Sequence, residues 1–176
     1  DGVLPAALAA KQAGREMIVP SGNGAEAGLA GSEHIYTART LMEVVHHLRG
    51  DRILPKAQSQ VDFIDAPMLD MADVRGQQSA RRAMEIAAAG GHHILLIGSP
   101  GCGKTLLASR LPGILPMASD EEAIESAAIA SVSGRGLDLT RFRQRPFRSP
   151  HHTSSAVALA GGGTQPKPGE ISLAHN

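Results

Sequence analysis

GSPGCGKT, residues 98–105, is the stretch of the sequence that decides the predicted fold class. It fits the pattern G-x-x-x-x-G-K-[ST], with Gly98, Gly103, Lys104 and Thr105 at the defining positions. Glycines let a loop curl so that its backbone N–H groups point inward at phosphate oxygens. The pattern therefore predicts a phosphate-binding loop (P-loop) between a strand and a helix, which is typical of an α/β fold.

The side chains of this loop predict how ATP and Mg²⁺ would be held. The Lys104 ammonium would bind the β- and γ-phosphates, and the Thr105 hydroxyl would bind Mg²⁺, so these two residues are the predicted catalytic pair. Thr105 is also the predicted metal ligand. The other residues expected to surround the phosphates, mostly through their backbone, are Gly98, Ser99, Pro100, Gly101, Cys102 and Gly103.

The segments around the loop carry helix and strand signals. The apolar run at 93–97 predicts a buried parallel strand that leads into the loop, and residues 104–111 predict the helix that follows. An alanine-rich apolar stripe at 80–88 predicts an earlier helix. Ser119 and Glu122 form a capping-box pattern, which predicts the start of a further helix.

The first fifty residues alternate the same two kinds of signal. Helices are predicted at 4–12 and 41–48, and strands at 17–19 and 35–36. Residues 51–70 hold two prolines and no clear period, which predicts a linker. The predicted segments are therefore 1–50, a linker at 51–70, and a second α/β unit at 71–176.

Composition limits the class of protein. The 176 residues are 42% hydrophobic with a formal net charge of zero, and the single cysteine excludes an internal disulfide framework. The sequence contains no run of about 18 apolar residues, so no membrane span is predicted. One tyrosine and three phenylalanines offer little for stacking on bases. The chain begins at Asp1 without a methionine, so we expect it to be a piece of a longer protein.

Three stretches carry a resemblance to a known family. DVRGQQSARRAMEIAAAGGHHILLIGSPGCGKT (73–105) and RPFRSPHHTSSAVALAGGGTQPKPGEISLAHN (145–176) resemble the Mg-chelatase-like AAA+ ATPases of the YifB/ComM type. DGVLPAALAAKQAGREMIVP (1–20) is similar to the end of the Lon-protease-like domain that precedes the ATPase in these proteins. The resemblance implies a partial Lon-like α/β domain at 1–50, followed by a P-loop AAA+ α/β domain at 71–176 that stops before its Walker B strand.

The resemblance also implies an activity. Members are cytoplasmic ATP hydrolases that form homo-hexameric rings, and the ComM branch is a DNA branch-migration helicase in natural transformation. DNA, branched or single-stranded, is therefore an expected partner, and no membrane is expected. Two alternatives stay open: a chelatase-like motor that remodels a protein partner without DNA, and a module that only binds nucleotide and oligomerises.

Departures from the family patterns remove two activities, proteolysis and ATP hydrolysis, from those expected of this chain alone. Leu4 stands where a Lon protease would carry its catalytic lysine, and Lys11 is expected only to solvate its helix, so no proteolysis is expected. The nearest apolar run with acids, 61–65, precedes the P-loop instead of forming a Walker B strand. We therefore expect this chain alone to bind nucleotide weakly at best and not to hydrolyse it.

Other candidate sites have competing interpretations. Residues 73–77 resemble the segment that packs beside adenine in AAA+ proteins, and Val74 is the candidate contact. The alternative is an ordinary helix start. Residues 133–152 hold five arginines and one aspartate, a local formal charge of +4, so Arg143, Arg145 and Arg148 are candidate DNA contacts. The alternative is a solvated face with salt bridges between subunits.

Two further patterns have plain structural readings. His151 and His152 would point to opposite faces of a strand, so no metal site is expected there. The glycine run 161–163 predicts a hairpin tip, because no Lys-Thr pair follows it as in a phosphate loop.

Overall fold

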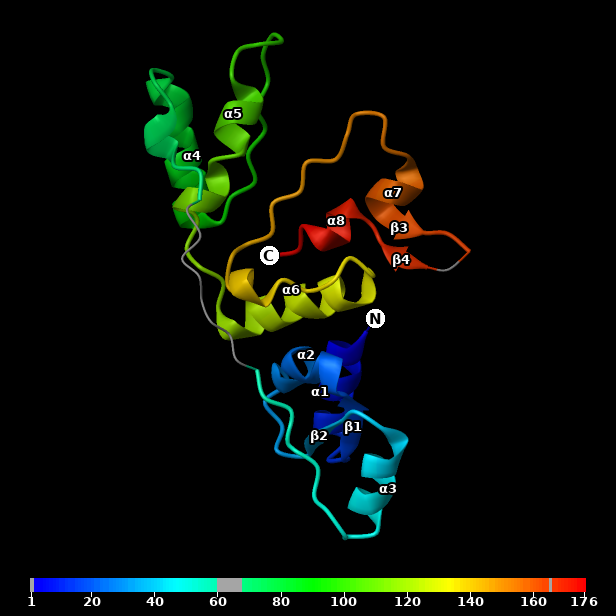
Figure 1. Cartoon of the computed structure of the whole chain (residues 1–176). Coiled ribbons are helices and arrows are strands. Elements are labelled where there is room, and N and C mark those ends of the chain that lie inside the picture. The colour runs from blue at the N-terminus through cyan, green and yellow to red at the C-terminus, as the bar shows by residue number, and fades with distance from the viewer. Residues whose placement is uncertain (1, 60–67, 165) are drawn as a thin grey trace.

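The computed structural model describes residues 2–59, 68–164 and 166–176 (Figure 1). Its first unit holds two parallel strands and three helices: α1 (Val3–Gln12), β1 (Met17–Pro20), α2 (Gly24–Gly28), β2 (Ile35–Ala38) and α3 (Leu41–Leu48). β1 pairs with β2 from Met17 opposite Ile35 to Pro20 opposite Ala38, and α2 connects the two strands. The predicted helices and strands of the first fifty residues are therefore confirmed.

The core of this unit forms where α1 and α2 cover the two strands. Leu4, Ala7, Ala27 and Ile35 are fully buried there. Leu4, at the position of the protease lysine, is thus a core residue. The expectation for Lys11 was wrong, because its ammonium donates a hydrogen bond of 2.7 Å to the Ala30 carbonyl.

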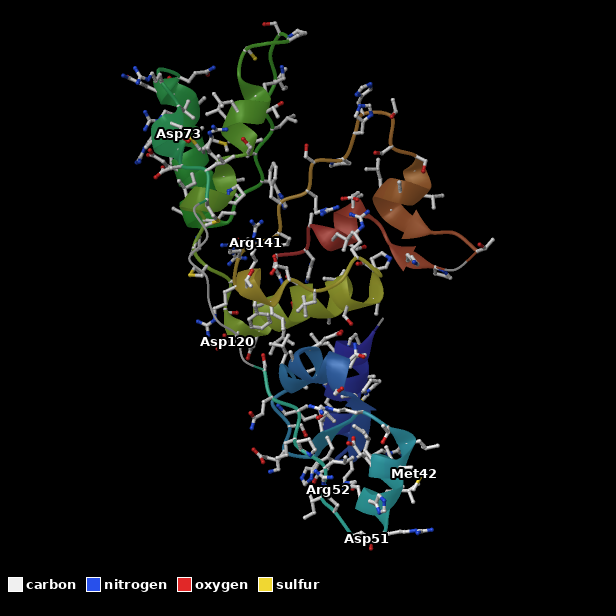
Figure 2. The ribbon with its side chains drawn as sticks, in the orientation of Figure 1. Met42, Asp51, Arg52, Asp73, Asp120 and Arg141 are labelled. Atoms are coloured by element: carbon white, nitrogen blue, oxygen red, sulfur yellow. The ribbon has the colours of Figure 1, made fainter. Side chains whose placement is uncertain are left out.

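The helix α3 lies at the far end of this unit and buries none of its residues. Leu41, Met42 and Leu48 are all exposed, and Figure 2 places Met42 at the outer edge of the helix. Thr40 caps its first turn by accepting from the Glu43 N–H at 3.3 Å. The cap supports the first turn, and packing on one face supports the rest of α3. Val44 and Val45 are half-buried, and the His47 ring lies 4.8 Å from the Tyr36 ring of β2.

Part of the predicted linker runs beside β2. The Thr37 N–H donates to the Pro55 carbonyl and the Ala57 N–H to the Ile35 carbonyl, both at 2.8 Å. Leu54 is buried beside them. The apolar run at 61–65 lies outside the described residues, and the bounds of the three predicted segments stay a prediction.

A second, smaller core holds the P-loop segment. It packs α4 (Gln78–Gly90) against α5 (Lys104–Ala108), with short 3-10 turns at Met71–Asp73 and Leu111–Ile114. Met71, Val74, Met84 and Leu107 are its buried residues. α5 is shorter than the predicted helix at 104–111, because a 3-10 turn containing Pro112 begins at Leu111.

The strand predicted at 93–97 is not formed, and this prediction was wrong. Ile94 and Leu96 pack on the second core, whereas Leu95 and Ile97 are 81% and 85% exposed. The alternation fits an extended chain. No other strand in the described part of the chain pairs with it, and an extended segment becomes a strand only when a neighbour supplies the hydrogen bonds.

The long helix α6 (Asp120–Val132) packs against the first unit (Figure 1). Its predicted capping box is confirmed, since Ser119 and Glu122 each accept from the other's backbone N–H. Ala127 joins the core beneath α1. The Ser131 carbonyl accepts from the Gly2 N–H at 3.0 Å, and its hydroxyl donates to Glu26 at 2.5 Å, so α6 is fastened to the N-terminal unit at one end.

The C-terminal segment folds over the other side of α6. It contains a 3-10 turn (Leu139–Arg141), α7 (Ala156–Ala160), β3 (Gly161–Gly162), β4 (Lys167–Pro168) and α8 (Glu170–Leu173). β3 pairs antiparallel with β4, so a hairpin is formed. Its predicted tip was wrong in position, because Gly161 and Gly162 lie in the first strand and pair with Pro168 and Lys167. A fourth 3-10 turn lies in the first unit, at Ser21–Asn23.

His151 and His152 lie in a turn, not a strand, and their ring centroids are 4.1 Å apart, so the expectation of opposite faces was wrong.

Among the described residues, every helix is too short or too polar to span a membrane.

Candidate nucleotide-binding site

The loop at 98–105 has the curled backbone that the sequence predicts. Gly101 and Gly103 have φ values of +80° and +91°, in the left-handed region that side chains disfavour. A Cβ atom at Gly98 would lie 2.8 Å from the Cys102 Sγ, so the loop closes tightly at its base. The backbone conformation therefore favours glycine at Gly101 and Gly103, and the close approach of Cys102 favours it at Gly98.

Lys104 folds back across the loop. Its Nζ donates hydrogen bonds of 2.8 Å to the carbonyl oxygens of Gly98 and Ser99, and lies 3.6 Å from the Cys102 Sγ. Phosphate oxygens would accept stronger hydrogen bonds from this ammonium than carbonyl oxygens do, because both partners would then be charged. The residues present thus fit a phosphate group next to Lys104.

Thr105 lies in the first turn of α5 and is exposed. Two residues later, Leu107 is buried in the second core and anchors the helix. A hydroxyl is one of the oxygen ligands that Mg²⁺ accepts beside phosphates and water. The side chain is therefore placed so that it can reach a metal ion held by a phosphate at the loop.

Gln77 ends the segment 73–77 that resembles the adenine-side segment of AAA+ proteins, but its contact with the P-loop was not predicted. Its Nε2 donates a hydrogen bond of 2.6 Å to the Cys102 carbonyl of the loop. Its backbone is left-handed, with φ of +53°, directly before α4. No local sequence signal marks this contact, because glutamine is not a residue that usually adopts a left-handed backbone.

Val74, the candidate adenine contact, lies in the second core and is only 2% exposed. Its carbonyl accepts a hydrogen bond of 3.3 Å from Arg81. Beside it, Asp73 forms an ion pair of 3.7 Å with Arg110, which joins the start of this segment to the end of the P-loop helix region. Contact between Val74 and a base stays a prediction.

The candidate DNA-binding arginines all have acidic partners. Arg143 pairs with Asp120, and Arg145 pairs with Glu122 at 3.0 Å. Arg148 donates to Glu170 from Nε at 2.6 Å and from Nη2 at 3.0 Å. The remaining arginines of the segment also have partners: Arg135 with Glu170 at 2.8 Å, and Arg141 with Asp138 at 3.8 Å.

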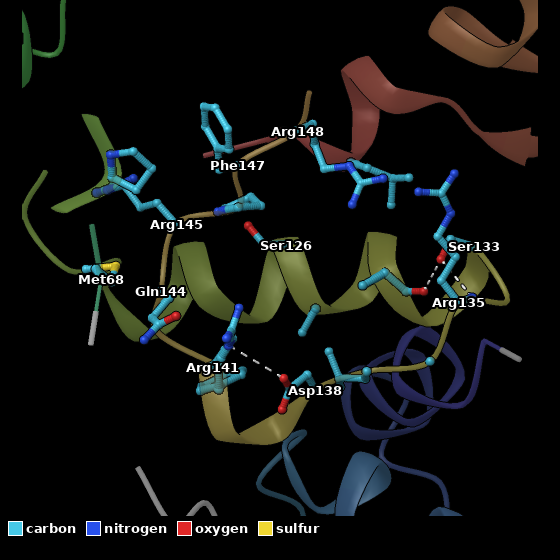
Figure 3. Close-up of a pocket in the computed structure, with 18 of the residues that line it drawn as sticks. Met68, Ser126, Ser133, Arg135, Asp138, Arg141, Gln144, Arg145, Phe147 and Arg148 are labelled. Carbon is cyan, nitrogen blue, oxygen red and sulfur yellow. Dashed lines mark hydrogen bonds and ion pairs between the residues drawn. The ribbon is translucent and has the colours of Figure 1, made fainter. Parts of the chain in front are cut away.

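Several of these arginines line a cavity of about 570 Å³ beside α6 (Figure 3). Arg145, Arg148, Phe142 and Phe147 are among its lining residues. The cavity therefore combines cationic and aromatic side chains, but carboxylates already balance much of the positive charge.

Glu170 is the strongest electrostatic feature of this segment. Hydrogen bonds from Arg148 and then Arg135 hold the pKa of its carboxyl down to about 2, from an ordinary value of 4.5. Its side chain is only 14% exposed. A carboxylate bound by two guanidiniums stays ionised at every physiological pH.

Histidines and acids do not form a metal site among the residues that the structure describes. The predicted absence of a metal at His151 and His152 is not tested by this observation, since the structure holds no ions. The His151 Nδ1 lies 2.7 Å from the Thr153 hydroxyl, so its ring takes part in a local turn.

The curled loop, its inward lysine and the helix that follows define the class of P-loop α/β proteins. The family profile described as "Magnesium chelatase, subunit ChlI" matches residues 70–176. The chain belongs to this Mg-chelatase-like family of AAA+ proteins, in its YifB/ComM branch.

Relatives support the same assignment along the whole chain. Competence protein ComM of Haemophilus influenzae is 51% identical over 180 residues, and YifB of Salmonella typhimurium is 50% identical over 175. Both alignments cover 99% of this chain and 35% of the relative, so the chain spans about a third of their length. An archaeal Lon protease of Halobacterium salinarum is 41% identical over 51 residues, which are 29% of this chain and 7% of the protease.

Proposed function

We propose that this chain binds ATP with Mg²⁺ and is the nucleotide-binding part of a ring-forming AAA+ ATPase that acts on DNA in the cytoplasm. The proposal that the chain binds a nucleotide rests on the Lys104 ammonium, which is folded inside the P-loop. Two left-handed glycines, Gly101 and Gly103, shape that loop around it.

The chain's residues would act through binding and charge. Lys104 would exchange the Gly98 and Ser99 carbonyls for β- and γ-phosphate oxygens, and Thr105 would hold Mg²⁺, which neutralises phosphate charge when bound. Ser99, Pro100, Cys102 and the glycines would enclose the phosphates with backbone. An arginine from a neighbouring subunit of a homo-hexamer would complete the site in trans, as the family resemblance implies.

The DNA part of the proposal draws on the relative named Competence protein ComM and on the arginine-rich segment 133–152. Arg143, Arg145 and Arg148 are the proposed phosphate contacts. Because all three already have carboxylate partners, DNA would have to compete with Asp120, Glu122 and Glu170 for them. That competition predicts weak, salt-sensitive binding by this segment.

The same ion pairs favour a second candidate function, a chelatase-like motor that remodels a protein partner without DNA. Paired arginines are suited to holding α6, α8 and the segment between them in place, as Arg148 and Glu170 do. This candidate predicts an ATPase rate that a protein partner raises and DNA does not. A module that only binds nucleotide and oligomerises would show no stimulated rate with either.

The test is the ATPase rate of the full-length gene product, with and without four-way junction DNA, at low and moderate salt. The DNA proposal predicts a junction-stimulated rate that declines with salt and is lost in Lys104→Ala. Lys167→Ala, in the hairpin, is a control for the loss of a lysine. A rate that no DNA changes would contradict the DNA proposal and favour the protein-remodelling motor.

A further inference from the structure

Gln77 holds an unfavourable backbone conformation directly beside the P-loop. Its φ and ψ are +53° and +38°, and it follows Gly76, which is also left-handed. A non-glycine residue in this region costs about 1 kcal/mol or more. Within the described ranges, Asn176 is the other non-glycine residue with a positive φ. Such a cost at Gln77 suggests that its side chain is needed where this backbone places it.

The side chain ends on the peptide group that joins Cys102 to Gly103. The Gln77 Nε2 donates to the Cys102 carbonyl at 2.6 Å. A Cβ atom at Gly103 would lie 3.3 Å from the same nitrogen, so the amide sits close against the glycine. The contact joins residues 25 positions apart, at the start of α4 and at the start of α5.

This peptide group is trans, since the described residues contain no cis peptide bond. In a trans peptide the carbonyl and the N–H point in opposite directions. Holding the Cys102 carbonyl toward Gln77 therefore turns the Gly103 N–H away from Gln77. No hydrogen bond from that N–H is found among the described residues, so it is available to a ligand.

We propose that Gln77 is a positioning residue for phosphate binding: it fixes the Cys102–Gly103 peptide so that the Gly103 N–H faces the phosphates. The inference rests on the proposed nucleotide function and deepens it. Gln77 would not touch the nucleotide itself. Its effect should therefore fall on the phosphates and leave contacts with the base and sugar unchanged.

The test uses the full-length gene product and two probes, Mg·ADP and adenosine, titrated by calorimetry. Gln77→Met keeps the side-chain length and the backbone strain but lacks the donor. Gln78→Met is the matched control, because Gln78 is exposed one residue further on and its side chain forms no hydrogen bond among the described residues. Gln77→Gly removes the donor and the strain together, which keeps the test valid if Gln77→Met folds poorly.

We expect Gln77→Met and Gln77→Gly to weaken ADP binding about fivefold, the size of one lost hydrogen bond, and to leave adenosine binding and Gln78→Met unchanged. Unchanged ADP binding in both variants, with ADP binding lost in Lys104→Ala, would overturn the positioning role alone. Equal losses for ADP and adenosine would overturn it too, by indicating general damage. If the unmodified protein binds no ADP, the proposed function itself fails.

Discussion

Arg148 and Glu170 form a two-point ion pair, with the Glu170 carboxylate accepting from Nε at 2.6 Å and from Nη2 at 3.0 Å. Arg135 adds a third hydrogen bond to the same carboxylate, at 2.8 Å. Three separate parts of the chain thus meet at Glu170: the turn after α6, the segment before α7, and the first residue of α8. Arg148, a candidate DNA contact in the sequence, is thus paired with a carboxylate of the same chain.

Glu170→Gln should show how tightly these arginines bind DNA when their carboxylate partner is removed. Loss of the carboxylate charge leaves Arg135 and Arg148 unbalanced, so we expect tighter binding to duplex DNA. We also expect the slope of log affinity against log salt to steepen by about one. The measurement is a fluorescence anisotropy titration at several salt concentrations.

Glu16→Gln is the matched control, because Glu16 is exposed and lies between α1 and β1 of the N-terminal unit. It removes the same charge and should change neither affinity nor slope appreciably. If Glu170→Gln binds DNA no better than this control, the arginine segment serves to hold the fold and not to contact DNA.

The same carboxylate predicts an acid-dependent stability. Its folded pKa is about 2 and its ordinary value 4.5, so its contribution is present above about pH 4.5 and is lost as pH falls toward 2. We expect the urea midpoint of the unmodified protein to fall over this window more steeply than that of Glu170→Gln. Parallel curves for the two proteins would contradict the assigned ion pair.

Ser119→Ala should remove the cap of α6. The hydroxyl accepts from the Glu122 N–H at 3.2 Å, and loss of an N-cap of this kind lowers the free energy of unfolding by about 1 kcal/mol. Urea denaturation followed by circular dichroism measures this. Ser79→Ala, in the exposed first turn of α4, makes the same substitution without removing a cap and should have little effect. A Ser119→Ala protein as stable as this control would refute the capping role.

Gly101→Ala tests the curled shape of the P-loop. A Cβ at Gly101 meets no atom within 4 Å, so the expected effect comes only from its φ of +80°. The strain of about 1–2 kcal/mol should weaken ADP binding by up to about thirtyfold. Gly22→Ala is the control, since that glycine also has open space but no positive φ. Equal ADP affinity in both variants would show that the loop does not need its left-handed residue.

Local patterns predicted local structure well. The P-loop curl depends on glycines within eight residues, and the capping box of α6 depends on Ser119 and Glu122, three residues apart. Both features were readable from the sequence because the partners are neighbours in the chain.

Features that depend on distant partners were not readable. The segment 93–97 has a strand's composition but lacks a paired neighbour in the described part of the chain. The pairing of Arg148 with Glu170 spans 22 residues, and that of Gln77 with Cys102 spans 25. Charge counts at 133–152 left two interpretations open, DNA contacts or a solvated face with salt bridges between subunits. They did not predict that folding brings acids from α6 and α8 of the same chain to these arginines.

The central claim is that Lys104 binds nucleotide phosphates in the P-loop. Its most direct test is a calorimetric titration of the full-length gene product with Mg·ADP, beside Lys104→Ala and the control Lys56→Ala from the segment that runs beside β2. We predict binding that Lys56→Ala retains and Lys104→Ala weakens by roughly ten- to a hundredfold, the range for hydrogen bonds to a charged group. Equal affinity in Lys104→Ala and the unmodified protein, or no binding in either, would contradict the claim.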